Sequence, residues 1–122
     1  MPTFNNDRAI FLQMADRLCE EILVGNYQED ERVPSVRDYA IAMQVNVNTA
    51  VKCYEHLGRL GIIYNKRGMG YFVSPGAKEA VLNERRQDFI DHVLPEIFRQ
   101  MDMLGIDLSL VNQLYQKKDA KE

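Results

Sequence analysis

The sequence predicts a mainly α-helical protein with one small β-hairpin, and three observations lead to this fold class. Two stretches near the middle of the chain repeat apolar residues at helical spacing and meet at a tight corner. Two aromatic and β-branched runs follow them and flank a glycine-bearing tip. After a Ser-Pro-Gly break at 74–76 the composition changes to helix formers, which predicts a helical region in the last third of the chain.

The N-terminal part is predicted to form a scaffold helix that ends at Gly25. Its apolar residues are spaced so that they share one helix face: Ile10, Phe11, Met14, Leu18, Ile22 and Leu23. A polar loop over 26–32 then leads into a short extended piece at Arg32-Val33.

The chain is organised around the stretch from Val33 to Leu60, which begins with a helix start. Ser35 can accept a hydrogen bond from the free N–H groups of a first turn, and Asp38 adds a favourable negative charge there. We therefore expect a helix from Val36. Its buried face is predicted to carry Tyr39, Ala40 and Met43.

A second helix is predicted from Val47 to Leu60, after a corner at 44–45, with Asn46 as its N-cap. The residues expected on its apolar face are Ala50, Cys53, Tyr54, Leu57 and Leu60. The residues left outward are Asn48, Thr49, Val51, Lys52 and Glu55. Two helices that share a core at a short corner fit the helix-turn-helix pattern, whose second helix enters the major groove of DNA N-terminus first.

The two runs at 62–64 and 71–73 predict a hairpin with a basic tip, which makes the motif a winged helix-turn-helix. The tip glycines allow positive φ angles and close approach of the backbone to a partner. Lys66 and Arg67 place positive charge where a phosphate strand or a minor groove can lie.

Residues 9–74 resemble the DNA-binding domain of the GntR family of bacterial transcription regulators. The matching segments are Leu-Val-Gly at 23–25, Val-Pro-Ser-Val-Arg-Asp at 33–38, Val-Asn-Val-Asn-Thr at 45–49, Tyr-Glu-His-Leu at 54–57, Leu-Gly-Ile-Ile at 60–63 and Arg-Gly-Met-Gly-Tyr-Phe-Val at 67–73. The Asn-Val-Asn-Thr variant and the short tail further resemble the YtrA-type subfamily, whose members carry only a pair of helices after the wing. The resemblance implies a DNA-binding transcription regulator that acts as a repressor, with the extended piece at 32–33 paired to the wing.

The resemblance also implies which residues meet the operator, and their chemistry agrees with it. Arginine can bind guanine through two hydrogen bonds, and asparagine can bind adenine in the same way. The predicted DNA-binding residues are Ser35, Arg37, Asn46, Val47, Asn48, Thr49, Lys52, Lys66, Arg67 and Gly68. Three alternatives stay open: an ion pair of Arg37 with Asp38 or Glu55, a purely capping role for Asn46, and an ordinary exposed turn at the hairpin tip.

The sequence departs from the wider family at two outward positions of the second helix. Many members have arginine where this chain has Val47 and Val51, so two base or phosphate contacts are absent. Valine can still touch a thymine methyl group, which favours a site richer in A·T pairs.

The region 76–122 is expected to be a helical dimerisation region, separate from the winged helix-turn-helix domain at 1–75. Its long helix is predicted over 77–104, with a kink before Pro95, and a last short helix capped by Asp107 is expected to fold back on it. The apolar residues of the long helix form a seam of Ile90, Leu94, Ile97, Met101 and Leu104. Such a seam favours a homodimer, which also supplies the two reading heads of a palindromic operator; packing within a monomer is the alternative.

The charge distribution supports a nucleic-acid partner despite a net charge of −3 for the 122 residues. Residues 33–73 hold five cations against two carboxylates, a local balance of +3. Phosphate attraction is screened beyond roughly 10 Å at about 0.1 M salt, so the local balance decides. The sequence shows no membrane-length apolar run and no leader peptide, which predicts a cytoplasmic protein.

Other functions receive little support from the residue types present. The two histidines, His56 and His92, are interpreted as surface or interface residues, and no catalytic motif, metal-ligand cluster or cofactor motif is recognised. Cys19 and Cys53 are interpreted as reduced thiols on apolar helix faces rather than a redox pair. A winged helix used for protein contact without DNA is the main rival. An unidentified small-molecule effector among Met101, Met103 and Tyr115 is a further option.

Overall fold

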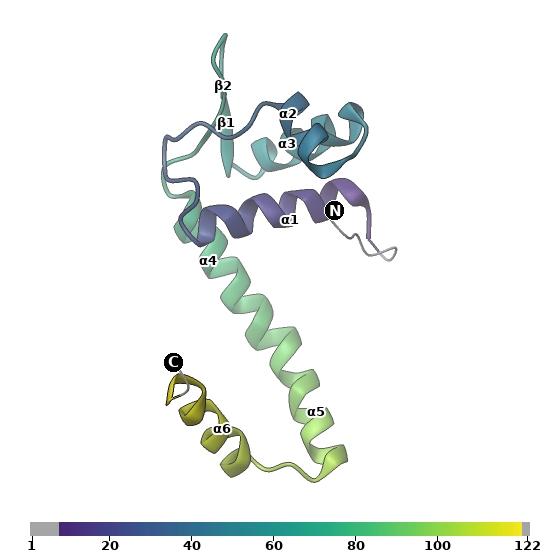
Figure 1. Cartoon of the computed structure of the whole chain (residues 1–122), viewed down its shortest axis with the longest axis vertical. Helices are drawn as coiled ribbons and strands as arrows, with labels where there is room; N and C mark the ends of the chain where they lie inside the picture. Colours follow the sequence, from purple (N-terminus) through teal and green to yellow (C-terminus); the bar gives the residue numbers. More distant parts are fainter. Residues whose placement is uncertain (1–7, 121–122) are drawn as a thin grey trace. The chain divides into compact units, whose positions relative to one another are not determined.

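The computed structural model describes residues 8–120 and divides the chain into two compact units, one ending at Asn83 and the other beginning at Glu84. The elements, coloured along the chain in Figure 1, are α1 (Ile10–Leu23), α2 (Val36–Met43), α3 (Val47–Arg59), β1 (Ile63–Lys66), β2 (Gly70–Val73), α4 (Ala77–Asp88), the π-helical turn η1 (Phe89–Val93), α5 (Leu94–Leu104) and α6 (Leu108–Ala120). The predicted fold class, mainly helical with one hairpin, is confirmed.

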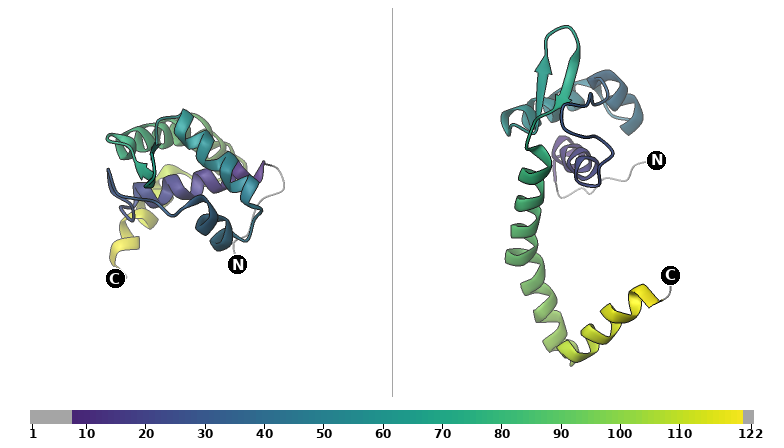
Figure 2. Two further views of the ribbon diagram at one scale, coloured as in Figure 1. Left: turned by 90° about the horizontal axis from the view of Figure 1, so that it is seen from above. Right: turned by 90° about the vertical axis from the view of Figure 1, so that its left-hand side faces the viewer.

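In the first unit α1 is a scaffold on which the helix-turn-helix rests. Met14, Leu18 and Ile22 are buried on the side of α1 that packs against α3. Ile10 was expected on the same face, but it opens the helix and is 45% exposed; Phe11 is half-buried, and the buried positions begin at Met14. The right-hand view of Figure 2 shows α1 end-on, with α2, α3 and the hairpin on the same side of it.

The two helices of the helix-turn-helix begin at the predicted caps. The Ser35 hydroxyl oxygen accepts a hydrogen bond from the Asp38 N–H at 3.0 Å, and the Asn46 side-chain oxygen accepts one from the Asn48 N–H at 2.8 Å. Between the helices Gln44 takes a left-handed conformation with φ of 57°, which turns the chain through the corner. The sharp corner therefore needs a conformation that glycine adopts more easily than glutamine does.

The buried face of α3 matches the predicted face except at its end. Ala50, Cys53, Tyr54 and Leu57 are buried, as expected. Leu60 is 58% exposed, so its placement on this face was wrong. The helix ends at Arg59, and the chain turns away at Leu60 before the next apolar position of the pattern can reach the core.

The hairpin is antiparallel, with Ile63 opposite Val73 at its base and Lys66 opposite Gly70 near its tip. The extended piece before α2 pairs with the outer edge of β2, as the family resemblance implied. The Val73 N–H donates to the Glu31 carbonyl at 2.9 Å, and an isolated bridge joins Arg32 to Phe72. The wing is therefore tied to the segment that leads into α2.

Tyr54 connects α2, α3 and the hairpin in the core of the first unit. It is fully buried, and its hydroxyl donates to the Pro34 carbonyl at 2.6 Å. Its ring meets the edge of the Tyr71 ring at 5.1 Å between centroids and lies 5.8 Å from the Tyr39 ring. Since Pro34 precedes the α2 cap and Tyr71 belongs to β2, one α3 side chain sets the positions of both neighbours.

The second unit consists of the end of α4, the turn η1, α5 and α6. The disturbance predicted near Pro95 is a π-helical turn, in which the Leu94 N–H donates to the Phe89 carbonyl five residues earlier. The wider turn accommodates the proline, which has no N–H and whose ring crowds the preceding turn of an α-helix. Gly105 then ends α5 with φ of 70°, and the Asp107 carboxylate caps the next helix by accepting from the Leu110 N–H at 3.1 Å.

α6 runs back from the end of α5, as Figures 1 and 2 show, but the helices of this unit bury little. No described residue from 84 to 119 is buried. The predicted seam residues Ile90, Ile97 and Leu104 are 55%, 39% and 65% exposed, while Leu94 and Met101 are half-buried. A single copy of the unit therefore leaves most of its apolar surface in water.

Cys19 and Cys53 are thiols rather than a disulfide, and Cys53 lies entirely within the core. Burial raises the pKa of the Cys53 thiol to about 12, with smaller contributions from Cys19 and Asp16. The thiol is therefore neutral at physiological pH and behaves as a small apolar group. Among residues 8–120, no helix has the length and apolar character that crossing a membrane requires.

We expect Tyr54→Phe to lower the free energy of unfolding by about 1–3 kcal/mol, because the ring is retained but the Pro34 carbonyl loses its donor. Urea denaturation of the full chain measures this. The matched control is Tyr64→Phe, which removes a hydroxyl that is bonded to Asp30 on the surface, and it should cost less. Equal losses for the two variants would contradict the role given to Tyr54.

Candidate nucleic-acid interface

The N-terminal tip of α3 presents polar side chains to solvent. Asn46, Val47 and Asn48 are exposed, Thr49 is half-buried, and Lys52 is exposed one turn further along the helix. The first backbone N–H groups of a helix lack partners within the helix, so its N-terminus carries partial positive charge. Asn46, Asn48 and Thr49 thus form an uncharged polar tip at a helix end that attracts phosphate.

Arg37 lies in the first turn of α2 and is exposed. Among the described residues no carboxylate forms an ion pair with its guanidinium, so the alternative pairing with Asp38 or Glu55 is not formed. Ser35, immediately before this helix, is half-buried, and its oxygen serves as the cap. A hydroxyl that accepts one bond can still donate its own proton, so the cap does not prevent a contact with phosphate.

The hairpin tip is a tight turn of three residues between the strands. The Met69 N–H donates to the Lys66 carbonyl at 2.8 Å, and Gly68 has φ of 78°. Gly68 is the third of the four residues 66–69 that this hydrogen bond closes into a turn, and a positive φ at that position favours glycine. Arg67 and Gly68 are exposed at the end of the turn, and the Lys66 ammonium lies 5.4 Å from the centre of the Phe72 ring.

One cation at the hairpin was missed by the sequence reasoning. Arg32 was treated only as part of an extended piece, but its side chain reaches the hairpin near the tip. A Cβ atom placed on Gly70 would lie 3.2 Å from the Arg32 Nε atom, so the guanidinium lies directly against the Gly70 backbone. The signal available in the sequence was the extended piece itself, since its pairing with β2 brings residue 32 to the wing.

The predicted site residues fall into two groups on the same side of α1. Arg37 and the α3 tip belong to the helix-turn-helix, while Lys66, Arg67 and Gly68 belong to the hairpin (Figure 1). Val51, where the wider family often carries arginine, is exposed on α3. The structure therefore presents a helix tip and a cationic hairpin, the two parts that a winged helix uses on duplex DNA.

Within residues 8–120 no group of three or more metal-ligating side chains comes together. The His56 ring meets the edge of the Phe11 ring at 5.9 Å, and His92 Nδ1 lies 3.0 Å from an Asp88 oxygen on the surface of the second unit. His56 is half-buried and His92 is exposed.

Comparison with known proteins decides the family. The chain is 32% identical over 103 residues to YhcF of Bacillus subtilis strain 168, an uncharacterised HTH-type transcriptional regulator, and the match covers 84% of each chain. A crystal structure of a putative transcriptional regulator of the GntR family from Bacteroides thetaiotaomicron is 42% identical, with a TM-score of 0.74, and covers 93% of this chain and 98% of that one. The chain belongs to the GntR family of transcriptional regulators.

This GntR-family regulator is also similar to a relative of stated activity. The HTH-type transcriptional repressor YtrA of Bacillus subtilis strain 168 is 30% identical over 104 residues, which cover 85% of this chain and 79% of YtrA. A scan against family models matches none. The relatives are transcription regulators and not enzymes, which agrees with the residue chemistry.

We expect Asn46→Asp to separate capping from DNA contact in this regulator. Aspartate caps a helix about as well as asparagine, so the free energy of unfolding should change little, whereas Asn46→Ala should cost about 1 kcal/mol. A carboxylate facing phosphates should weaken binding to a mixed-sequence duplex about tenfold or more. Urea denaturation and fluorescence anisotropy measure the two effects, and unchanged binding by the stable Asp variant would leave Asn46 with a capping role alone.

Proposed function

We propose that this GntR-family regulator represses transcription by binding a palindromic DNA operator as a homodimer. The observation that carries the proposal is the exposed α3 tip beside a cationic hairpin. The tip would enter the major groove, and the hairpin would lie along the adjacent phosphate strands or minor groove. Repression is supported by the likeness to YtrA, which is a repressor.

The direct reading of bases is assigned to few side chains. Arg37 is exposed and unpaired among the described residues, so it is available to bind a guanine edge through two hydrogen bonds. Asn48 is exposed and its side chain is not used by the cap, which leaves it free to read adenine. Val47 presents only methyl groups and is 40% exposed, which favours contact with thymine.

The remaining contacts are assigned to the DNA backbone. Ser35, Thr49 and Lys52 flank the reading residues on α2 and α3, while Lys66, Arg67 and Gly68 extend the surface along the hairpin. Backbone contacts fix orientation and register and carry no sequence information directly. A small number of cations predicts modest affinity for random DNA and a shallow dependence on salt.

The homodimer is assigned to the second unit, which has an apolar surface without a partner in one chain. Ile97, Met101 and Leu104 follow one face of α5, and Leu108 and Leu114 on α6 are 70% and 59% exposed. Contiguous exposed apolar surface of this kind marks an interaction site. A second copy of the chain is the favoured partner, because a two-fold axis pairs the same surface with itself and yields two DNA-binding domains.

A small-molecule effector has a weaker basis than the dimer. An open cavity of about 440 Å³ lies where α5 passes into α6, lined by Phe98, Met101, Asp102, Ile106, Asp107 and Leu108. Of the residues named from the sequence only Met101 lines it, while Met103 and Tyr115 are 65% and 63% exposed. The residues that line the cavity do not indicate a class of ligand, and the same surface is part of the proposed dimer region.

The experiment that tests the proposal most directly is selection of duplexes from a random pool by the full chain. We expect an inverted repeat whose half-site spacing reflects a dimer. Failure to retain any duplex in low salt would overturn the proposal and favour the rival, a winged helix that contacts protein. Recovery of a single half-site would keep DNA binding but remove the symmetric dimer.

We expect Arg37→Ala to cost about 1–3 kcal/mol of binding to the selected duplex and to relax preference at one base pair. Arg67→Ala is the matched comparison, because it also removes one guanidinium but from the hairpin tip. It should weaken all duplexes alike and lower the slope of log affinity against log salt by about one. Anisotropy titrations on selected and mixed-sequence duplexes measure both, and an Arg37 variant that binds like the parent would remove Arg37 from base reading.

We expect Ile97→Asp to convert the dimer to a monomer of 14.1 kDa, because it places a charge in the apolar seam. Light scattering coupled to gel filtration measures the mass. Arg99→Asp is the control on the same helix, since two residues turn an α-helix by about 200° and put Arg99 on the opposite face. A parent protein that already runs as a monomer at micromolar concentration would contradict the dimer.

A further inference from the structure

The outer face of the hairpin carries Arg32 in addition to the cations at the tip. Arg32 bridges to Phe72, and residues directly opposite in antiparallel strands share one face. Gly70 lies two residues from Phe72 and therefore on the same face. The short approach of the Arg32 Nε atom to the Gly70 backbone, 3.2 Å from the place of a Cβ, agrees with this geometry.

Because Gly70 has no side chain, the Arg32 guanidinium can lie against the backbone of the hairpin. Any side chain at this position would meet the Nε, Nη2 and Cζ atoms of Arg32, at 3.2, 3.5 and 3.7 Å from its Cβ. Gly70 also has φ of 102°, which other residues rarely adopt. Gly70 thus allows the backbone conformation with positive φ and also leaves space for the Arg32 side chain.

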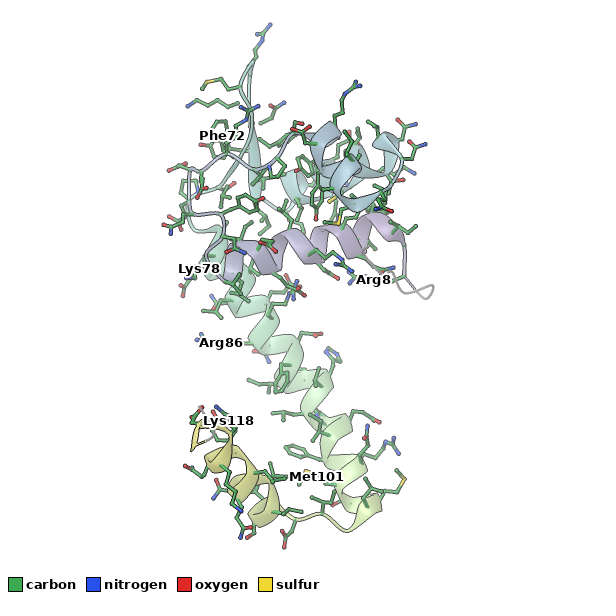
Figure 3. All side chains as sticks on the ribbon, in the orientation of Figure 1. Arg8, Phe72, Lys78, Arg86, Met101 and Lys118 are labelled. Carbon is green, nitrogen blue, oxygen red and sulfur yellow. The ribbon has the colours of Figure 1, made fainter. Side chains whose placement is uncertain are left out.

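The rest of the same face combines one further cation, Lys66, with the aromatic rings of Tyr64 and Phe72. Lys66 is opposite Gly70, and Tyr64 is opposite Phe72, with their rings stacked at 5.8 Å and 23°. We call Arg32, Tyr64, Lys66, Gly70 and Phe72 the outer hairpin face. In Figure 3, side chains that end in nitrogen (blue) stand along the hairpin above the labelled Phe72.

The opposite face of the hairpin packs on the core at its base, and beyond the base Asn65 and Tyr71 line an open hollow with α3. Ile63 and Val73 are buried, and Tyr71 packs against Tyr54. The outer hairpin face is open to solvent: Arg32 and Lys66 are exposed, and Tyr64 and Phe72 are half-buried.

The acidic residues next to Arg32 in the sequence bond groups other than Arg32, and one of them, Asp30, does so at Tyr64 of the outer hairpin face. The Glu29 carboxylate accepts from the Gly76 N–H at 2.8 Å, Asp30 from the Tyr64 hydroxyl at 2.9 Å, and Glu31 from the Gln28 N–H at 2.9 Å. The Asp30 N–H donates to the Val73 carbonyl at the base of the hairpin. Negative charge therefore lies toward the base and positive charge toward the tip.

Arg32 itself has no carboxylate partner among residues 8–120. An exposed arginine that lies against a glycine backbone and is not neutralised by a carboxylate is available to bind an anion. Its planar guanidinium can donate two parallel hydrogen bonds to a phosphate.

We propose that Arg32, together with Lys66, binds one phosphate strand along the outer hairpin face when the tip enters the minor groove. The groove is only about 6 Å wide, so a hairpin inserted there has a phosphate strand beside each face. This assignment rests on the proposed function and adds to it a backbone contact that lies outside the helix-turn-helix and the tip. It fixes the direction in which the wing lies along the duplex.

The test uses the full chain and Arg32→Ala, with anisotropy titrations against a mixed-sequence duplex and the selected duplex. One lost phosphate contact should lower the slope of log affinity against log salt by about 0.9. The factor by which the variant binds more weakly than the parent should therefore shrink about 3.5-fold between about 50 mM and about 200 mM salt. The loss of affinity relative to the parent should be the same for both duplexes, because a contact to the DNA backbone does not distinguish base sequences. Phosphate ethylation interference should lose one sensitive phosphate per half-site.

Three variants separate charge from structure. Arg32→Lys keeps the positive charge and should show the same salt slope as the parent. Arg32→Gln keeps much of the aliphatic part of the side chain but not the charge, and it should behave like Arg32→Ala. Arg86→Ala removes one exposed positive charge from the second unit and should leave the slope unchanged. If Arg32→Ala unfolds, the Lys and Gln pair still distinguishes a charge contact from a packing role.

Two results would overturn the inference, and they differ from failure of the proposed function. An unchanged salt slope in Arg32→Ala or Arg32→Gln, with Arg37→Ala still impaired, would leave DNA binding intact and reduce Arg32 to a structural residue. An unchanged ethylation pattern would do the same. A parent chain that retains no duplex would overturn both proposals together.

Discussion

The first unit depends on one buried tyrosine that belongs to the recognition helix and determines the positions of its neighbours. The Tyr54 hydroxyl is bonded to the backbone just before the α2 cap, and its ring packs on Tyr71 of the wing. A buried hydroxyl requires a partner, so this geometry has little freedom. Burial raises the pKa of Tyr54 well above its usual value, so the hydroxyl keeps its proton and remains a donor at any physiological pH.

Local sequence signals predicted the helix-turn-helix well because its parts are fixed over short distances. Ser35 and Asn46 form caps with N–H groups two or three residues away, and the apolar spacing of α3 repeats within one helix. Leu60 was misplaced because periodicity does not show where the chain leaves the helix. The π-helical form of the Pro95 disturbance was not predicted, since a proline shows where a helix is disturbed but not how the backbone adapts.

The position of Arg32 could not be predicted from neighbouring residues, because it depends on a pairing with Phe72 forty residues away along the chain. The register of that pairing decides which face of the hairpin the side chain joins. The acidic run at 29–31 directly precedes this pairing, and its side chains are exposed. Two of its carboxylates, Glu29 and Asp30, bond Gly76 and Tyr64 and so hold the loop to the base of the wing.

The π-helical turn between α4 and α5 has a consequence for the angular position of the apolar stripe. A π turn contains one more residue than an α turn, so the residues after it are rotated by about a quarter of a turn relative to an uninterrupted α-helix. Ile90 lies inside the turn, while Leu94, Ile97, Met101 and Leu104 follow it and share the face of α5. Insertion or loss of a single residue at this turn would therefore change the direction in which the whole apolar stripe faces without altering the helices on either side.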